Sequence, residues 1–147
     1  MNESITIEEV EAWDGLNEYE GRIRGTLHGV SIDFYVQMSD PAVWLRLSCG
    51  DVIEGDVRFE RYGRLDVWQE VSDGGGGAIL PCLESLGGVS YGLTGDVIHV
   101  TDTDLRLLCG FSIDVDPALE LLDDGVTRSL EVGDRVRIEG RFIFDPD

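Results

Sequence analysis

The sequence contains no lysine, and all 11 basic residues among its 147 positions are arginine. The chain therefore has no phosphate-binding lysine of a nucleotide loop, no kinase strand lysine and no amine for a Schiff base. Lysine-held pyridoxal phosphate is excluded for the same reason. Histidine is also scarce, with two residues, so few groups change their charge near neutral pH. We expect no cofactor.

Cysteine and long apolar runs are rare as well. Cys49, Cys82 and Cys109 form no CxxC pair and do not suit the disulfide framework of a small secreted domain, which predicts reduced, mostly buried thiols. No stretch reaches about 18 apolar residues, the length of a membrane span. The first four residues show neither the basic region nor the apolar run of a signal peptide. We therefore expect a cytoplasmic protein that does not enter a membrane.

Acidic residues dominate the charge, with 30 Asp and Glu and a formal net charge of −19. One interpretation is solvent: short carboxylates hold water and cations, and lysine-free, Asp-rich compositions resemble those of salt-accumulating halophiles. The other is a partner: an acidic face can mimic nucleic acid or neutralise a basic enzyme. The acids are spread from Glu3 to Asp147 without a block of five, which favours solvent.

The local patterns predict a mainly β fold. Short alternating or β-branched segments are separated by Gly, Asp and Pro, which is typical of a small barrel or sandwich of about 8–10 short antiparallel strands, an OB-like barrel being one form. The predicted strands are 22–27, 31–37, 43–47, 57–62, 65–71, 97–100, 105–108, 111–115 and two strands within 132–144 around Gly140.

A short N-terminal helix is predicted over residues 7–14. Thr6 and Glu9 form a capping box, and the chain has acidic residues in the first turn. The alternation of Ile5 and Ile7 with polar residues is also typical of a strand. Further short helical turns are predicted at 81–86 and 117–122, each with a proline near its start.

The chain is predicted to form a single compact domain over 1–147, with two similar halves at 16–71 and 89–144. A glycine-rich loop, 72–78, separates them, because four consecutive glycines favour neither helix nor strand. Two internal alignments suggest a duplication, but they require opposite orders of the matched segments. They match 40–43 with 116–119, and 45–50 with 105–110.

Residues 130–142 read Leu-Glu-Val-Gly-Asp-Arg-Val-Arg-Ile-Glu-Gly-Arg-Phe. This run resembles the late strand of many OB-type barrels, in which a Gly-Asp turn leads into alternating apolar residues. The resemblance implies a barrel and no particular function, because such barrels serve many functions.

One segment combines arginines with aromatic residues. On a barrel hairpin, stacked aromatics and arginines can bind single-stranded nucleic acid. The acidic charge of the chain disfavours this partner, and the ordinary interpretation is that these arginines offset nearby carboxylates. The candidate residues are Arg58, Arg61, Tyr62, Arg64 and Trp68.

Two weaker patterns resemble a metal site and a catalytic site. His99, Asp102 and Asp104 could hold a divalent metal, but an exposed strand followed by an Asp-rich turn is the favoured interpretation, because a metal site would show more ligands at fixed spacing. Gly88–Gly92 matches the Gly-x-Ser-x-Gly pattern of a nucleophile elbow, yet its surroundings indicate a glycine-rich turn.

We therefore expect a non-enzymatic binding or assembly protein with a protein partner, adapted to a high-salt cytoplasm. The alternatives are an OB-like nucleic-acid-binding protein that uses the Arg/aromatic hairpin, and an acidic inhibitor or immunity-type protein against a basic enzyme. The sequence leaves the oligomeric state open.

Overall fold

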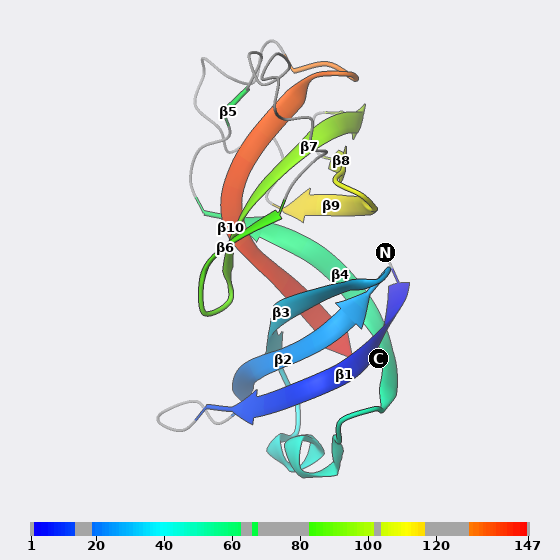
Figure 1. The fold of residues 1–147 in the computed structure, drawn as a ribbon, viewed down its shortest axis with the longest axis vertical. Coiled ribbons are helices and arrows are strands. Elements are labelled where there is room, and N and C mark those ends of the chain that lie inside the picture. Colours follow the sequence, from blue (N-terminus) through cyan, green and yellow to red (C-terminus); the bar gives the residue numbers. More distant parts are fainter. Residues whose placement is uncertain are drawn as a thin grey trace. The chain divides into compact units, whose positions relative to one another are not determined.

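The computed structural model describes residues 2–13, 19–62, 66–67, 83–101, 104–116 and 130–146, without side chains at 66–67. Within these residues it has ten strands and one 3-10 helix (Figure 1). The elements are β1 (Asn2–Ala12), β2 (Glu20–Leu27), β3 (Val30–Gln37), η1 (Pro41–Arg46), β4 (Val52–Arg61), β5 (Asp66–Val67), β6 (Leu83–Gly87), β7 (Ser90–Val100), β8 (Leu105–Leu108), β9 (Ser112–Asp116) and β10 (Arg135–Pro146).

The prediction of a mainly β barrel is confirmed. Paired strands follow the order β5-β10-β3-β2-β1-β4-β9-β8-β7-β6, and a β10–β7 pairing closes eight of them into a barrel. A further pairing joins β4 to β10. The chain divides into two compact units. Unit 1 is Met1–Arg58 with Phe142–Asp147, and unit 2 is Phe59–Arg141.

Unit 1 has the strand connectivity of an OB barrel. β1, β2 and β3 form an antiparallel meander, β1 pairs antiparallel with β4, and the last part of β10 pairs parallel with β3. The helix η1 connects β3 to β4. Five strands with a helix after the third follow the connectivity that is typical of such a Greek-key barrel.

The core of unit 1 is apolar and aromatic. Ile5 and Ile7 of β1 and Ile23 of β2 are at most 1% exposed. Phe34 lies edge-on to Phe142 and Phe144, with ring centroids 6.1 and 5.9 Å apart. The end of β10 therefore supplies aromatic side chains on which the N-terminal meander packs.

Unit 2 is built around a second meander, β7, β8 and β9. The first part of β10 pairs antiparallel with β7, and β6 pairs antiparallel with the same strand. The end of β4 reaches β10, where the Tyr62 N–H donates to the Glu139 carbonyl at 2.7 Å. Its core includes Phe59, Leu93, Leu107 and Ile138, each at most 1% exposed.

The same turn occurs in each unit, directly before β4 and before β10. In unit 1 the Ser48 N–H donates to the Asp51 carboxylate at 2.9 Å, and Gly50 has φ +96°. In unit 2 the Glu131 N–H donates to the Asp134 carboxylate at 2.8 Å, and Gly133 has φ +102°. Only glycine adopts such a φ without strain, so both turns need Gly-Asp.

These turns dock on the first strand of each meander in the same way. The Gly50 N–H donates to the Ile7 carbonyl and the Ile7 N–H to the Asp51 carbonyl, both at 2.8 Å. In unit 2, Val97 takes the place of Ile7 and bonds to Gly133 and Asp134 at 2.9 and 2.8 Å. A bulge follows at once in each strand, at Glu8 and Ile98. We call positions that share such a place counterparts.

The second and third strands of the meanders correspond as well. Arg24 of β2 is opposite Asp33 of β3 and contacts its carboxylate at 2.9 Å. Arg106 of β8 is opposite Asp114 of β9 and contacts its carboxylate at 2.8 Å. Both units therefore follow one local plan: a bulged strand, a hairpin with a cross-strand Arg–Asp pair, and a Gly-Asp turn into a long strand.

This plan bears on the two predicted halves without testing their boundaries. The unit boundaries fall inside β4 and β10, and the glycine-rich residues 72–78 lie outside the described residues. The alignment of 45–50 with 105–110 matches the end of η1 to strand β8. It therefore reflects similar composition, whereas the counterparts above share geometry.

The predicted helix over 7–14 is wrong, because this segment belongs to strand β1 through Ala12. The alternation of Ile5 and Ile7 decides the outcome: both side chains enter the core of unit 1. Strands β2 and β4 pair with the two edges of β1 and satisfy its backbone. The capping residues Thr6 and Glu9 lie within the strand.

Two predictions near prolines are wrong. The strand expected at 43–47 is largely the helix η1, and the Asp40 side chain caps it by accepting from the Ala42 N–H at 3.0 Å. The helical turn expected at 81–86 is strand β6 from Leu83 onward. The helical turn expected at 117–122 lies outside the described residues.

Two predictions about β10 are also wrong. It is one continuous strand where two were expected around Gly140. This glycine lies directly against the Glu60 carbonyl, where a Cβ would collide, so it marks a close backbone approach and not a break. The strands are also not all antiparallel, because β10 runs parallel to β3.

Candidate functional site

The outer face of β1, β2 and β3 in unit 1 carries the densest network of charged side chains that the structure describes. Arg22 and Arg24 alternate with the buried Ile23, and Asp33 precedes the buried Phe34. The period of two residues in a strand therefore puts the charged side chains on the face opposite the core.

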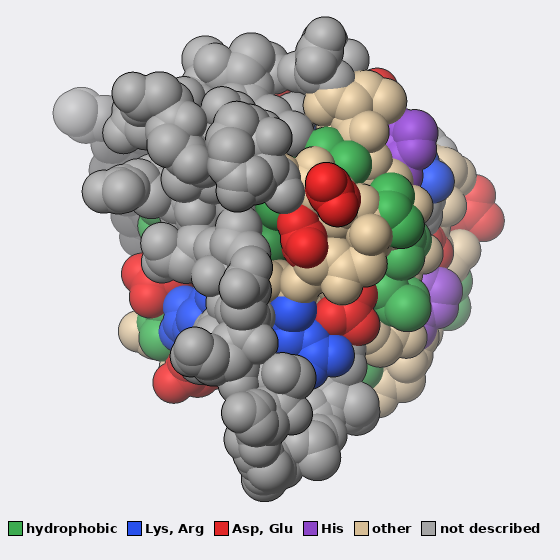
Figure 2. All heavy atoms as spheres, turned by 90° about the horizontal axis from the view of Figure 1, so that it is seen from above, with side chains coloured by type: hydrophobic (Ala, Val, Ile, Leu, Met, Phe, Trp, Pro, Cys, Tyr) green, Lys and Arg blue, Asp and Glu red, His purple; other side chains and the backbone are tan. Residues whose placement is uncertain are grey.

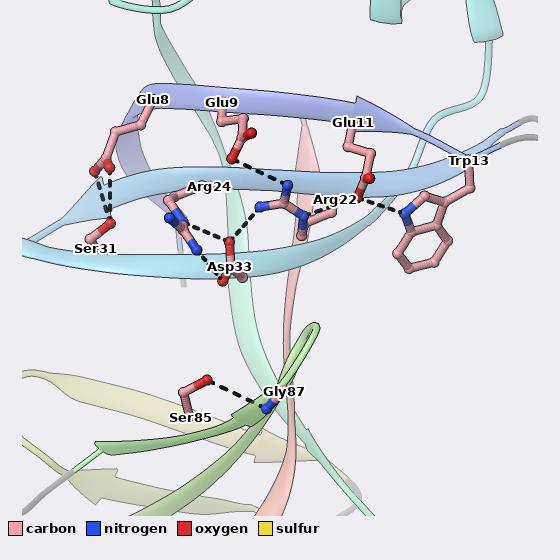
Figure 3. A network of polar contacts seen from close by, with 10 residues as sticks. All are labelled: Glu8, Glu9, Glu11, Trp13, Arg22, Arg24, Ser31, Asp33, Ser85 and Gly87. Carbon is pink, nitrogen blue, oxygen red and sulfur yellow. Dashed lines mark hydrogen bonds and ion pairs between the residues drawn. The ribbon is translucent and has the colours of Figure 1, made fainter.

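Arg22 is the centre of this network (Figure 3). Its guanidinium contacts Asp33 at 2.7 Å, Glu11 at 3.1 Å and Glu9 at 3.2 Å. Arg24 donates to both carboxylate oxygens of Asp33, at 2.9 and 3.1 Å. Both arginines of β2 thus donate to carboxylates on a neighbouring strand.

Aromatic rings border one end of the network. The Trp13 indole N–H donates to Glu11 at 3.2 Å, and the Trp13 ring lies 5.9 Å from that of Tyr35 at 44°. The Tyr35 hydroxyl donates to the Glu20 carboxylate. Because the polar group of each ring is hydrogen-bonded to a carboxylate, both rings are held in place at this border of the network.

The network holds fixed charges. Burial raises the pKa of Asp33, but hydrogen bonds from Arg24 and Arg22 outweigh it, and the pKa lies below its usual range. Burial also lowers the pKa of Arg22, while the hydrogen bonds that it donates to Asp33, Glu11 and Glu9 raise the pKa further than burial lowers it. Both groups are charged at neutral pH, so neither is poised to exchange a proton.

The bulge of β1 carries a smaller polar cluster on the same unit. The Glu8 carboxylate accepts from the Thr26 hydroxyl at 2.5 Å and from the Ser31 hydroxyl at 3.0 Å (Figure 3 shows the Ser31 contact). The extra residue of the bulge turns this side chain over β2 and β3. We call Glu8, Thr26 and Ser31 the polar triplet.

The structure describes three of the five residues predicted to bind nucleic acid: Arg58, Arg61 and Tyr62. Arg58 contacts Asp145 at 2.5 Å and Asp56 at 3.3 Å. Arg61 is 6% exposed and lies on the opposite face of β4, whereas Tyr62 is 45% exposed. Arg64 and Trp68 lie outside the described residues, so the complete Arg/aromatic site stays a prediction.

The predicted metal residues are also covered only in part. His99 lies at the surface of β7 and Asp104 just before β8, while Asp102 lies outside the described residues. Among the residues that the structure describes, no three His, Cys, Asp or Glu side chains are grouped to hold a metal ion.

The Gly-x-Ser-x-Gly motif forms a hairpin turn. Gly87 and Gly88 have φ +109° and +58°, and Ser90 is the first residue of β7. The Ser90 hydroxyl lies 3.5 Å from that of Tyr62. A serine at the start of a strand lacks the strand-to-helix turn that a nucleophile elbow requires.

Most described arginines are paired within the chain. Their guanidinium nitrogens lie 2.5 to 3.3 Å from carboxylate oxygens. The paired residues are Arg22, Arg24, Arg58, Arg106, Arg135, Arg137 and Arg141. The outward charge of these faces is consequently set by the carboxylates in excess.

Sequence reasoning missed the network around Arg22, although a signal was present. His28 and Gly29 form a two-residue turn with positive φ, and such a turn fixes the register of its hairpin. Counting outward from it places Arg24 opposite Asp33, as observed.

Fold and site together define a closed β-barrel protein of net charge −19, in which most described arginines pair with carboxylates of the same chain. No family model, curated protein or solved structure matches the chain. Across the described part of the chain, none of the helices has the length and apolar character that a membrane crossing requires.

Proposed function

We propose that this is a non-enzymatic binding protein for a protein partner with basic side chains, working in a salt-rich cytoplasm. The pairing of the arginines carries the proposal. Arginines that already donate to carboxylates of their own chain offer little to an anionic ligand. The remaining surface potential is acidic, as the net charge of −19 requires, and it attracts cations or a basic partner.

The salt-rich environment follows from the same charge. Mutual repulsion among 30 acidic residues opposes folding in dilute buffer. In molar salt the Debye length falls to about 3 Å, so this repulsion is screened. Circular dichroism over a potassium chloride series tests this part of the proposal. We expect the melting temperature to rise steeply as the salt concentration increases to the molar range. Full stability in dilute buffer would contradict it.

Selection from a library of displayed peptides that differ in net charge tests which class of partner the protein binds. We expect selection on the folded protein in molar salt to enrich peptides that carry arginine and lysine. Enrichment of acidic peptides would overturn the proposal, as would turnover of a substrate by the purified protein. An inhibitor of a basic enzyme is one form of the proposed binding protein.

Nucleic acid binding is the second candidate, because the OB connectivity of unit 1 favours it. Fluorescence anisotropy with single-stranded oligonucleotides decides between the two. Binding that weakens steeply with salt would support this candidate. No binding at the lowest salt that keeps the protein folded would exclude it.

A further inference from the structure

The position of the polar triplet is occupied differently in unit 2. The counterpart of Glu8 is Ile98, since each is the bulge residue that follows the strand position bonded to the Gly-Asp turn. The counterpart of Thr26 is Leu108, two residues after the arginine of the cross-strand pair. The counterpart of Ser31 is Ser112, two residues before the aspartate of that pair.

These replacements leave apolar side chains at the surface of unit 2. Ile98 is 38% exposed and Leu108 is 41% exposed. Val132 is 66% exposed, and the Gly133 that follows it donates to the carbonyl of Val97, the neighbour of Ile98. Figure 2 shows one face of the molecule on which apolar side chains lie exposed beside carboxylates. We call Ile98, Leu108 and Val132 the apolar patch.

The fold does not require apolar residues at these places. Unit 1 has the same bulge and hairpin with the polar residues Glu8 and Thr26 in place of Ile98 and Leu108. Exposed apolar side chains that the scaffold does not need indicate an interaction surface. High salt strengthens apolar association and screens charge, so such a patch suits the proposed environment.

Carboxylates lie close to the patch along the chain. Glu131 is exposed next to Val132, and the exposed Asp104 precedes the strand that carries Leu108. A matching partner segment therefore has apolar side chains for the patch and basic side chains for this border.

We propose that the apolar patch of unit 2 docks a partner segment in which apolar and basic side chains alternate. This inference rests on the proposed function and places its binding surface on β7, β8 and the turn before β10. An extended segment suits the patch, because alternation gives one face to the apolar residues and leaves the basic residues at the border.

The test transplants the polar triplet into unit 2. The double variant Ile98→Glu with Leu108→Thr recreates Glu, Thr and Ser at counterpart positions, because Ser112 is already present. The probe is a fluorescein-labelled peptide in which leucine alternates with arginine, measured by anisotropy in molar potassium chloride. We expect the double variant to bind it about tenfold or more weakly, as loss of two apolar contacts implies.

Two further variants serve as an independent test of the patch and as a control. Val132→Thr changes the patch on a separate element and should weaken binding severalfold. This variant still tests the patch if the double variant fails to fold. Val52→Thr is the matched control, since Val52 is 63% exposed but lies in unit 1. It should leave binding unchanged.

The outcomes separate the two proposals. Equal binding by wild type and both patch variants would overturn the patch while the proposed function stands. Binding by none of them would overturn both. Stronger binding of a leucine–glutamate peptide would overturn the partner chemistry. Concentration-dependent self-association, lost in the double variant, would replace the partner segment by a second copy of the chain.

Discussion

Unit 1 and unit 2 share a local plan but differ on their outer faces. In unit 1 the face of the meander is covered by ion pairs around Arg22 and by the polar triplet. In unit 2 the corresponding face has the cross-strand pair of Arg106 with Asp114 and the pair of Asp96 with Arg135 of β10, and it exposes Ile98 and Leu108. The shared geometry fixes the turns and the register, whereas the outward positions differ between the units, and on our proposal those of unit 2 serve binding.

The largest effect should come from the glycines at which β4 and β10 approach each other. A Cβ on Gly55 would collide with the Asp145 carbonyl, and a Cβ on Gly140 with the Glu60 carbonyl. We expect Gly55→Ala and Gly140→Ala each to lower the free energy of unfolding by about 3 kcal/mol, since the backbone must move. Urea denaturation in molar salt measures this.

Gly25 provides the control for this prediction. A Cβ there would lie 3.1 Å from Ile5 Cδ1 and 3.2 Å from the Thr6 carbonyl oxygen, which are tight contacts and not collisions, so Gly25→Ala should cost about 1 kcal/mol. If only one of the two strand glycines proved sensitive, the close approach would not be a shared feature of the two units.

The second largest effect should be a loss of stability that differs between the outer face of unit 1 and that of unit 2. Arg22 has a side chain that is 15% exposed and three carboxylate partners, so Arg22→Gln should destabilise by about 2 kcal/mol. Arg106 is 42% exposed with one described partner, and Arg106→Gln should cost at most about 1 kcal/mol. Equal losses in chemical denaturation would show that the network adds nothing beyond a single pair.

The mainly β fold class and many of the strands could be predicted from the sequence, because the residue pattern of a short strand is local. The strand around Arg22 and the turn at Gly29 needed only alternation and turn chemistry. The N-terminal segment failed because Thr6 and Glu9 satisfy a local capping rule, while pairing with two distant strands decides the structure.

The site was less predictable than the fold. The Arg/aromatic site stays a prediction, because Arg64 and Trp68 lie outside the described residues, and the pairing of Arg58 with Asp145 is a long-range contact that no local pattern indicates. The apolar patch also escaped notice, since an exposed Leu108 looks like a core residue until the register of β7 and β8 is known.

The third prediction concerns pH. The pKa of Asp33 is lowered in the folded protein, so its contribution to stability is complete above the unfolded value of about 3.9 and is lost as pH falls through the folded value. Asp33→Asn should destabilise the protein at neutral pH and flatten the loss of stability below about pH 4. An unchanged acid limb in urea titrations would show that Asp33 does not carry this linkage.

The smallest effect is on reactivity rather than stability, and it compares one thiol in each unit. Cys49 is exposed in the turn of unit 1, whereas burial raises the pKa of Cys109 in unit 2 to about 11. In a Cys82→Ser background, a thiol reagent at mildly alkaline pH should label Cys49 at once and Cys109 at least about a hundredfold more slowly, since the thiolate reacts and burial blocks access. Mass spectrometry of the labelled protein assigns each site, and Cys49→Ser in the same background isolates the slow phase.

Because the slow phase of labelling, that of Cys109, requires unit 2 to open, Gly140→Ala should accelerate it more than Arg22→Gln does. Equal acceleration by both variants would mean that the two units open together, and the contrast between them would then be confined to their surfaces.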